Sequence, residues 1–204
     1  MYNIKFKGNF SKKEYDNELL PKNSIKVPTN NGKILSIFLI VIMIILTLFN
    51  FFTSKPITNH SPSELIFCIF VTMICLLPIF ILHEFLHAIC FPKNSIKEIW
   101  YEYNKKNLFL FSFQVYTNTP LKRNNFLFML LLPNILLSII PLIIWHLGIL
   151  SDYPFISRIF GAVFTILFTS GASDYSLFFD TILNTSKNDY ILMYKNNFYY
   201  TNTQ

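Results

Sequence analysis

Long apolar stretches alternate with polar ones along the chain. Each apolar stretch is long enough to cross the hydrocarbon core of a bilayer as a helix. The four stretches cover residues 34–52, 65–91, 126–150 and 159–181. The pattern predicts a mainly α-helical, polytopic membrane protein whose four transmembrane helices lie within residues 34–181. A polar segment (residues 1–33) precedes this membrane domain, and a polar, tyrosine-rich tail (residues 182–204) follows it.

A different pattern separates the second and third apolar stretches. Residues 96–103 and 108–116 are rich in aromatic and β-branched side chains, and a polar tetrapeptide, Asn-Lys-Lys-Asn, lies between them. This arrangement predicts a short β-hairpin over residues 96–116. An aromatic belt at the membrane interface, without strand order, is the alternative. The opening residues 2–7 alternate apolar with polar side chains, which indicates a short strand there.

Composition and charge agree with a membrane protein. Hydrophobic residues make up 52% of the chain, and the mean hydropathy is +0.42. The net charge of +6 would suit a nucleic-acid binder, but the Lys and Arg residues flank the apolar stretches. Seven precede residue 34, six lie between residues 92 and 125, and two follow residue 181, whereas only Lys55 and Arg158 lie on the other side. We therefore expect no nucleic-acid partner, and a multi-pass protein of the cell membrane with both termini in the cytoplasm.

The second apolar stretch carries the candidate chemistry. It contains His83-Glu84-Phe85-Leu86-His87, and Glu84 is the sole charged side chain between residues 65 and 91. Two histidines four residues apart on a helix differ by about 40° in direction and about 6 Å along the axis, so both rings can reach one metal ion. His83 and His87 are therefore candidate Zn²⁺ ligands, and Glu84 is a candidate general base acting on a water molecule. The alternative is a pair of neutral histidines bonded to a neighbouring helix, with Glu84 paired to a lysine.

Depth in the membrane selects a candidate third ligand. His83 and His87 lie eight and four residues before the predicted cytoplasmic end of their helix, and Asp174 lies about seven residues before that end of the fourth span. The three side chains can therefore lie at one level. His146 is twenty residues from the cytoplasmic end of the third span, which is too far. Asp180 lies at the interface, where a solvated or a capping role is expected.

These residues resemble the membrane zinc metalloproteases of the site-2 protease group, and more closely the small bacterial zincin peptidases allied to it. The resemblance covers roughly residues 65–181 and rests on His-Glu-Phe-Leu-His-Ala at residues 83–88 and Gly-Ala-Ser-Asp at residues 171–174. It implies a zinc ion held by His83, His87 and Asp174, a water molecule activated by Glu84, and hydrolysis of peptide bonds within or next to the membrane.

The chain departs from the site-2 protease pattern in two places. Tyr175 follows the candidate ligand Asp174, where that group has glycine. The Asn-Pro pair that helps the larger members to position substrate is also missing near this aspartate. Asn134, in the third span, is the candidate substrate-binding residue in its place.

Three functions remain open at this point. The leading hypothesis is a zinc-dependent endopeptidase acting on a membrane protein or peptide, with the predicted hairpin holding the extended substrate by strand addition. The second is a non-catalytic regulatory or self-protection protein whose metal is structural or absent. A fourth protein ligand such as Cys90, which shares a helix face with His87, would favour it. The third, a transporter using Glu84 and Asp174 as proton carriers, does not explain the histidine spacing.

Overall fold

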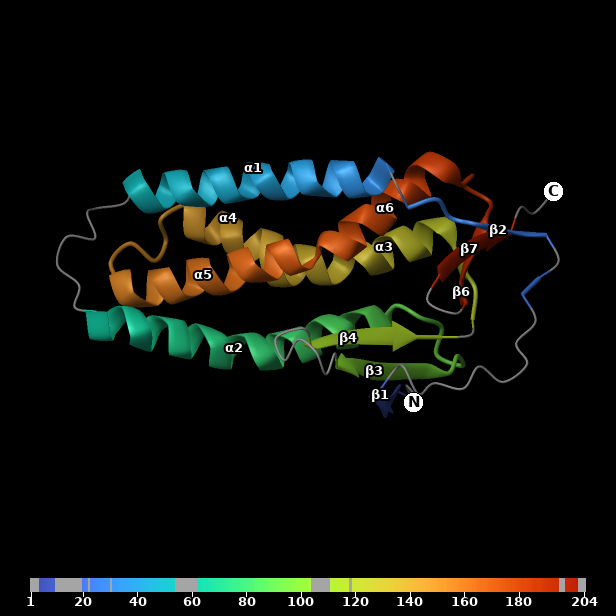
Figure 1. Cartoon of the computed structure of the whole chain (residues 1–204), viewed down its shortest axis with the longest axis horizontal. Helices are drawn as coiled ribbons and strands as arrows, with labels where there is room; N and C mark the ends of the chain where they lie inside the picture. The colour runs from blue at the N-terminus through green and yellow to red at the C-terminus, as the bar shows by residue number, and fades with distance from the viewer. Residues whose placement is uncertain are drawn as a thin grey trace.

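The computed structural model describes residues 4–9, 20–21, 23–29, 31–53, 62–103, 111–117, 119–194 and 197–201. Long helices lie side by side along the longest axis of the molecule, and two small sheets gather at one end (Figure 1). The helices are α1 (Asn31–Thr53), α2 (Pro62–Ile89), α3 (Arg123–Asn134), η2 (Ile135–Ile139), α4 (Ile140–His146), α5 (Pro154–Ser170) and α6 (Ala172–Asn184). The described part of the chain is therefore mainly helical, as predicted.

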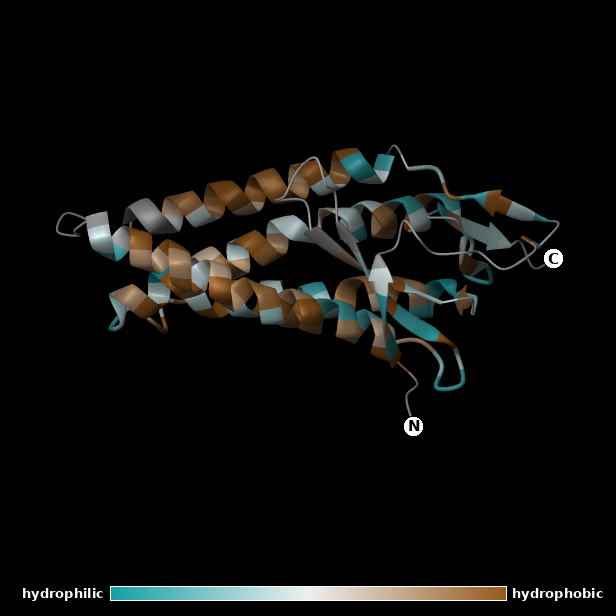
Figure 2. Ribbon diagram, turned by 60° about the horizontal axis from the view of Figure 1, so that its bottom comes forward, coloured by the Kyte–Doolittle hydropathy of each residue, from teal (hydrophilic) through white to brown (hydrophobic). Residues whose placement is uncertain are grey.

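Three helical stretches are long and apolar enough to cross a membrane, or up to four if the bent pair α5 and α6 forms one span. The three are α1, α2 and the continuous run from α3 to α4. Figure 2 shows hydrophobic residues along the helices and more hydrophilic ones at the end that bears the sheets. Many large apolar side chains on α1 and α2 are exposed, as expected for helices that face lipid. The finding agrees with a membrane protein.

The third span differs from the predicted uniform helix over residues 126–150. It begins at Arg123 and ends at His146, because Gly148 adopts a positive φ of 73° that a helix cannot continue through. Its middle, η2, is a π-helix. Pro133, just before η2, lacks the N–H that an α-helix needs at that position, so the regular ladder is interrupted there.

The fourth predicted span, residues 159–181, is two helices. α5 begins earlier, at Pro154, which is suited to the first turn of a helix because it needs no donor there. α5 and α6 meet at Gly171 with a bend of 42°. A side chain at Gly171 would overlap Asn134 Oδ1, so the glycine lets α3 approach the bend closely.

Both sheets lie at the same end of the bundle (Figure 1). In the first sheet, β1 (Ile4–Asn9) pairs parallel with β3 (Lys97–Tyr103), which pairs antiparallel with β4 (Phe111–Tyr116). The strands β3 and β4 fall where the hairpin was predicted, and β1 covers most of the predicted N-terminal strand. Residues 104–110, which would connect the hairpin, lie outside the described residues.

The second sheet was not predicted, because the two ends of the chain read as polar flanks. Its strand order is β2 (Ser24–Lys26), β7 (Asn197–Thr201), β6 (Tyr190–Tyr194) and β5 (Leu121–Lys122), and all neighbours are antiparallel. The signal was present, since residues 190–194 and 197–201 are apolar and aromatic runs separated by Lys-Asn. The sheet brings the segment before α1 and the segment after α6 together.

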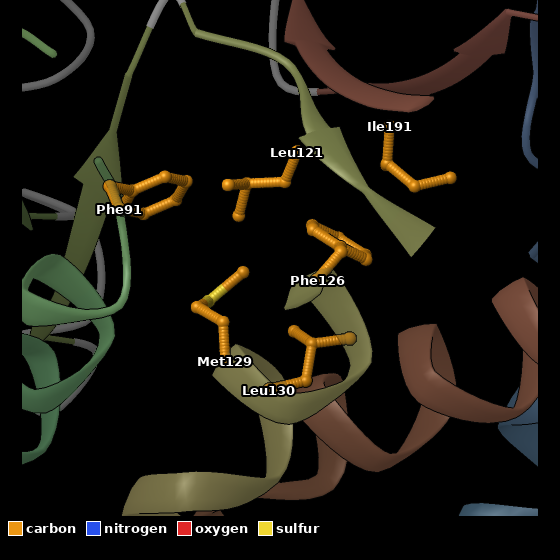
Figure 3. Close-up of a cluster of buried hydrophobic side chains, with 6 residues drawn as sticks. All are labelled: Phe91, Leu121, Phe126, Met129, Leu130 and Ile191. Atoms are coloured by element: carbon orange, nitrogen blue, oxygen red, sulfur yellow. The ribbon is translucent and has the colours of Figure 1, made fainter. Parts of the chain in front are cut away.

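An apolar cluster fastens the sheets to the helix ends (Figure 3). Its buried side chains come from the segment just after α2, from β5, from the first turns of α3 and from β6: Phe91, Leu121, Phe126, Met129, Leu130 and Ile191. The start of α3 is thereby fixed relative to the end of α2, where the histidine motif lies.

Asp180 fixes the N-terminus of α1. Asp180 is 1% exposed, and its Oδ1 accepts a hydrogen bond from the Gly32 N–H at 2.7 Å. A carboxylate at a helix N-terminus satisfies a donor that has no partner within the helix and complements the helix dipole. Of the two roles expected for Asp180, the structure shows the capping role.

Replacing Gly32 with Ala is expected to destabilise the protein. The new Cβ would overlap the Ser176 carbonyl oxygen on α6 and lie 2.6 Å from Asp180 Cγ, so α1 must move away and weaken the cap. Overpacking of this kind costs about 1–3 kcal/mol. Thermal unfolding of the detergent-solubilised protein measures the effect. Gly8→Ala, where a Cβ meets nothing within 4 Å, is the control and should leave the unfolding temperature unchanged.

Candidate metal centre

The helix α2 presents two buried imidazoles at its sheet-facing end. His83 Nε2 and His87 Nε2 lie 3.1 Å apart, and the rings meet edge to face with centroids 4.8 Å apart. The half-buried Glu84 belongs to the same group, because one possible ligand atom from each of the three residues lies within 4.8 Å of the others. The i, i+4 spacing thus brings both rings to one point, as the sequence predicted.

Asp174 joins this group from the first turn of α6. Its Oδ2 lies 3.1 Å from His83 Nε2 and 3.4 Å from His87 Nε2. The third residue predicted from depth is therefore beside the two histidines. The chain bends at Gly171, and α6 begins directly after it, so Asp174 lies in the first turn of a new helix beside the two histidines.

The three atoms fit a zinc ion. A tetrahedral Zn²⁺ with bonds of about 2.0–2.1 Å places its ligand atoms about 3.3 Å from one another. The two Nε2 atoms and Asp174 Oδ2 are separated by 3.1 to 3.4 Å. Two imidazole nitrogens and a carboxylate oxygen packed this closely in a buried place need a cation or shared protons between them. Their chemistry, nitrogen and oxygen donors, is that of zinc sites.

Neighbouring groups orient two of the three candidate ligands. His87 Nδ1–H donates a hydrogen bond to the Met129 carbonyl oxygen at 2.9 Å, which leaves the Nε2 lone pair for a metal. Asn134 Nδ2 donates to Asp174 Oδ2 at 2.9 Å. Asn134 is 1% exposed and lines neither cavity beside the site. Asn134 therefore contacts a candidate ligand, and its role in substrate binding stays a prediction.

Two cavities open onto the site. The larger, about 390 Å³, runs from Glu84 and His87 between β4 and the β6–β7 hairpin. The smaller, about 220 Å³, extends past His83 to Phe80 on α2 and to the end of α5. Glu84 and Asp174 line both. Glu84 is therefore bordered by open space on two sides, unlike a group beside a closed structural metal site.

The edge of β4 borders the larger cavity. Phe113, Gln114 and Val115 are consecutive, and all three line it. Successive side chains of a strand point to opposite faces of the sheet. A cavity that touches three consecutive residues therefore runs along the edge of the strand rather than over one face. Among the described residues β4 pairs with β3 alone, on its other edge.

The regular pairing of β3 with β4 also argues against the alternative of an aromatic belt without strand order.

Three further residues that the sequence singled out lie apart from the ligand group. Tyr175 is 2% exposed and packs against Phe168 in a separate apolar cluster, so the residue that replaces glycine does not intrude on the site. His146 ends α4 and its Nδ1–H donates to the Leu142 carbonyl oxygen. The Cys90 thiol donates to the Leu86 carbonyl oxygen at 3.3 Å, one turn earlier along the chain. The structure gives no support to a fourth protein ligand from Cys90.

Sequence reasoning named Asn134 only as a candidate for substrate binding, and it missed the Met129 carbonyl that accepts the His87 hydrogen bond. A backbone carbonyl such as that of Met129 has no signature of its own in a sequence. Pro133 was a usable signal, however, because a proline inside a helix removes the hydrogen bond to the carbonyl four residues earlier, which is that of Met129.

Comparison with known protein families gives one match. The family model described as "Putative zincin peptidase" matches residues 76–190, from the middle of α2 to the start of β6. No curated protein and no solved structure matches the chain. The resemblance to the site-2 protease group stays a prediction. Zincins are zinc peptidases with an H-E-x-x-H helix, so the family implies zinc, and the His83-Glu84-His87 group could hold it. Because the match covers more than half of the 204 residues, the chain belongs to the family described as "Putative zincin peptidase".

Proposed function

We propose that the protein is a membrane-embedded zinc endopeptidase that hydrolyses peptide bonds within or next to the membrane. The observation that carries the proposal is the convergence of His83 Nε2, His87 Nε2 and Asp174 Oδ2, with Glu84 beside them and open to two cavities. Catalytic zinc sites have three protein ligands and keep one position open, whereas structural sites are closed by a fourth. This arrangement favours an enzyme over the non-catalytic alternative.

Glu84 is the general base of the proposed reaction. His83, His87 and Asp174 would hold the zinc ion, which would lower the pKa of a water molecule towards neutrality and polarise the carbonyl group to be attacked. Glu84 takes a proton as the water attacks the peptide carbonyl carbon and delivers it to the nitrogen of the leaving amine as the C–N bond breaks. Its position one residue after His83 keeps the carboxylate beside the ligands, and its exposure to both cavities gives it access to water and substrate.

The substrate is proposed to be an extended segment of a membrane protein or peptide. A transmembrane helix has its backbone hydrogen bonds closed, so a stretch around the scissile bond must unwind before attack. The edge of β4 that faces away from β3 borders the larger cavity, which Phe113 to Val115 line together with Glu84, so we expect such a stretch to lie alongside β4. The charge distribution favours the cytoplasmic side for this end of the bundle, where β1 and β7 also lie.

Removing the metal is expected to abolish cleavage reversibly. The protein is reconstituted in lipid vesicles with a bacterial membrane-protein fraction, and new peptide N-termini are identified by mass spectrometry. They should appear with the zinc-loaded protein, disappear after treatment with a zinc chelator, and return when Zn²⁺ is restored. The same fraction without the protein is the control. Cleavage that persists without metal would exclude a metallopeptidase, and zinc-loaded protein that produces no new N-termini would favour the non-catalytic alternative.

A further inference from the structure

Two consecutive residues of α3 lie behind two of the candidate ligands. Asn134 bonds to Asp174, and Pro133 stands four residues after Met129, whose carbonyl oxygen holds His87. We infer that Pro133 and Asn134 act together as a ligand-positioning unit, which presents the His87 lone pair and the Asp174 carboxylate oxygen to the metal. The inference rests on the proposed zinc site and assigns to these two residues a positioning role rather than a catalytic one.

Pro133 acts because it has no backbone N–H to donate. In a regular α-helix the N–H of residue 133 would donate to the carbonyl of residue 129, but proline has no N–H. The Met129 carbonyl oxygen therefore receives no bond from that position and accepts the His87 Nδ1–H at 2.9 Å instead. His87 and Met129 are both buried, so water does not compete for this bond. A proton fixed on Nδ1 leaves the lone pair on Nε2, the atom that faces His83 and Asp174.

Asn134 holds the carboxylate with a neutral donor. Its Nδ2 group donates to the Leu130 carbonyl oxygen at 3.0 Å and to Asp174 Oδ2 at 2.9 Å. Both partners are acceptors, so the amide nitrogen must face them and the orientation of the side chain is fixed by chemistry. A side chain on Gly171 would overlap Asn134 Oδ1 on the opposite side of the amide. The amide is therefore clamped between the α5–α6 bend and the candidate ligand.

The helix changes form where this unit lies. The π-helix η2 begins directly after Asn134, and Ser138 Oγ–H donates to the Asn134 carbonyl oxygen at 2.6 Å. Short π-helical stretches inside α-helices are frequent at functional sites. Here the change from α-helix to π-helix comes directly after Asn134, whose side chain bonds to Asp174. An unbroken α-helix would supply neither the available Met129 carbonyl nor this local adjustment.

Two variants test the unit by zinc affinity rather than by activity. Pro133→Ala restores the N–H that competes with His87 for the Met129 carbonyl, and Asn134→Leu keeps the side-chain size but removes the donor. Each is expected to weaken zinc binding about 10- to 100-fold, the effect typical of groups that orient ligands. Competition with a chelator measures the affinity of the purified protein in nanodiscs. The visible spectrum of the Co²⁺-substituted protein, which reports the geometry of the ligands, should change in both variants.

Pro141→Ala is the matched control, because it removes another proline from the same span at the start of α4. It should leave zinc affinity and the Co²⁺ spectrum unchanged. Thermal unfolding of the metal-free proteins separates positioning from stability, since Pro133→Ala should not lower the unfolding temperature. Zinc affinity within twofold of wild type and an unchanged Co²⁺ spectrum in folded Pro133→Ala would overturn the inference, even if Asn134→Leu fails to fold. Wild-type protein that binds no zinc would instead refute the proposed function itself.

Discussion

Replacing Glu84 with Gln is expected to abolish peptide hydrolysis while one zinc ion per chain remains bound. Glutamine has the shape of glutamate but cannot take a proton at neutral pH, whereas the three candidate ligands, His83, His87 and Asp174, are untouched. Loss of a general base lowers kcat about 10²- to 10⁴-fold. The rate of release of new N-termini from a cleaved membrane protein measures kcat, and elemental analysis of the purified variant measures zinc.

Glu64→Gln is the control for this experiment. Glu64 is an exposed residue in the first turn of the same helix α2, and its replacement should change neither zinc content nor rate. Undiminished cleavage by Glu84→Gln would exclude Glu84 as the general base. Loss of zinc together with activity would instead make Glu84 a ligand, and the assignment of the base would then be wrong.

Local sequence patterns predicted the structural features that are determined by residues close together in the sequence. Runs of apolar residues located the helices, because a span needs about 20 apolar residues whatever its surroundings. The aromatic runs around the Asn-Lys-Lys-Asn segment predicted the region where β3 pairs with β4. The spacing of His83 and His87 was sufficient to place both rings together, since helical geometry alone determines it. Asp174 required one further assumption, that residues at equal depth in two spans can meet.

The features that were missed depend on contacts between distant parts of the chain. The pairing of residues 24–26 with residues 199–201 joins the two ends of the chain, and no local pattern shows which strands will be partners. At the bend, Gly171 lies against Asn134, which is 37 residues earlier in the sequence. For the same reason the bond from Asn134 to Asp174 was not foreseen, although Asn134 itself was singled out. The bond from His87 to a main-chain carbonyl could be anticipated only through the effect of Pro133.

Replacing Asp174 with Asn is expected to remove zinc and activity together. The amide keeps the shape of the carboxylate and its place beside Asn134, so the fold should persist, but it loses the negative charge and turns its oxygen or its nitrogen towards His83 and His87 at 3.1 and 3.4 Å. Because a ligand itself is lost, zinc affinity should fall by more than the roughly 10- to 100-fold typical of groups that only orient ligands. Chelator competition on the purified variant measures this fall.

Two comparisons make the Asp174→Asn result decisive for the choice of third ligand. Asp152→Asn changes an exposed aspartate in the loop before α5, so zinc affinity should stay at the wild-type value. Cys90→Ala tests the closed site of the non-catalytic alternative and should also leave zinc affinity unchanged, because the Cys90 thiol bonds to the Leu86 carbonyl oxygen. If Cys90→Ala lost zinc and Asp174→Asn retained it, the site would be one that binds metal through α2 alone. Glu84 would then face no activated water, and the two cavities would no longer indicate an enzyme.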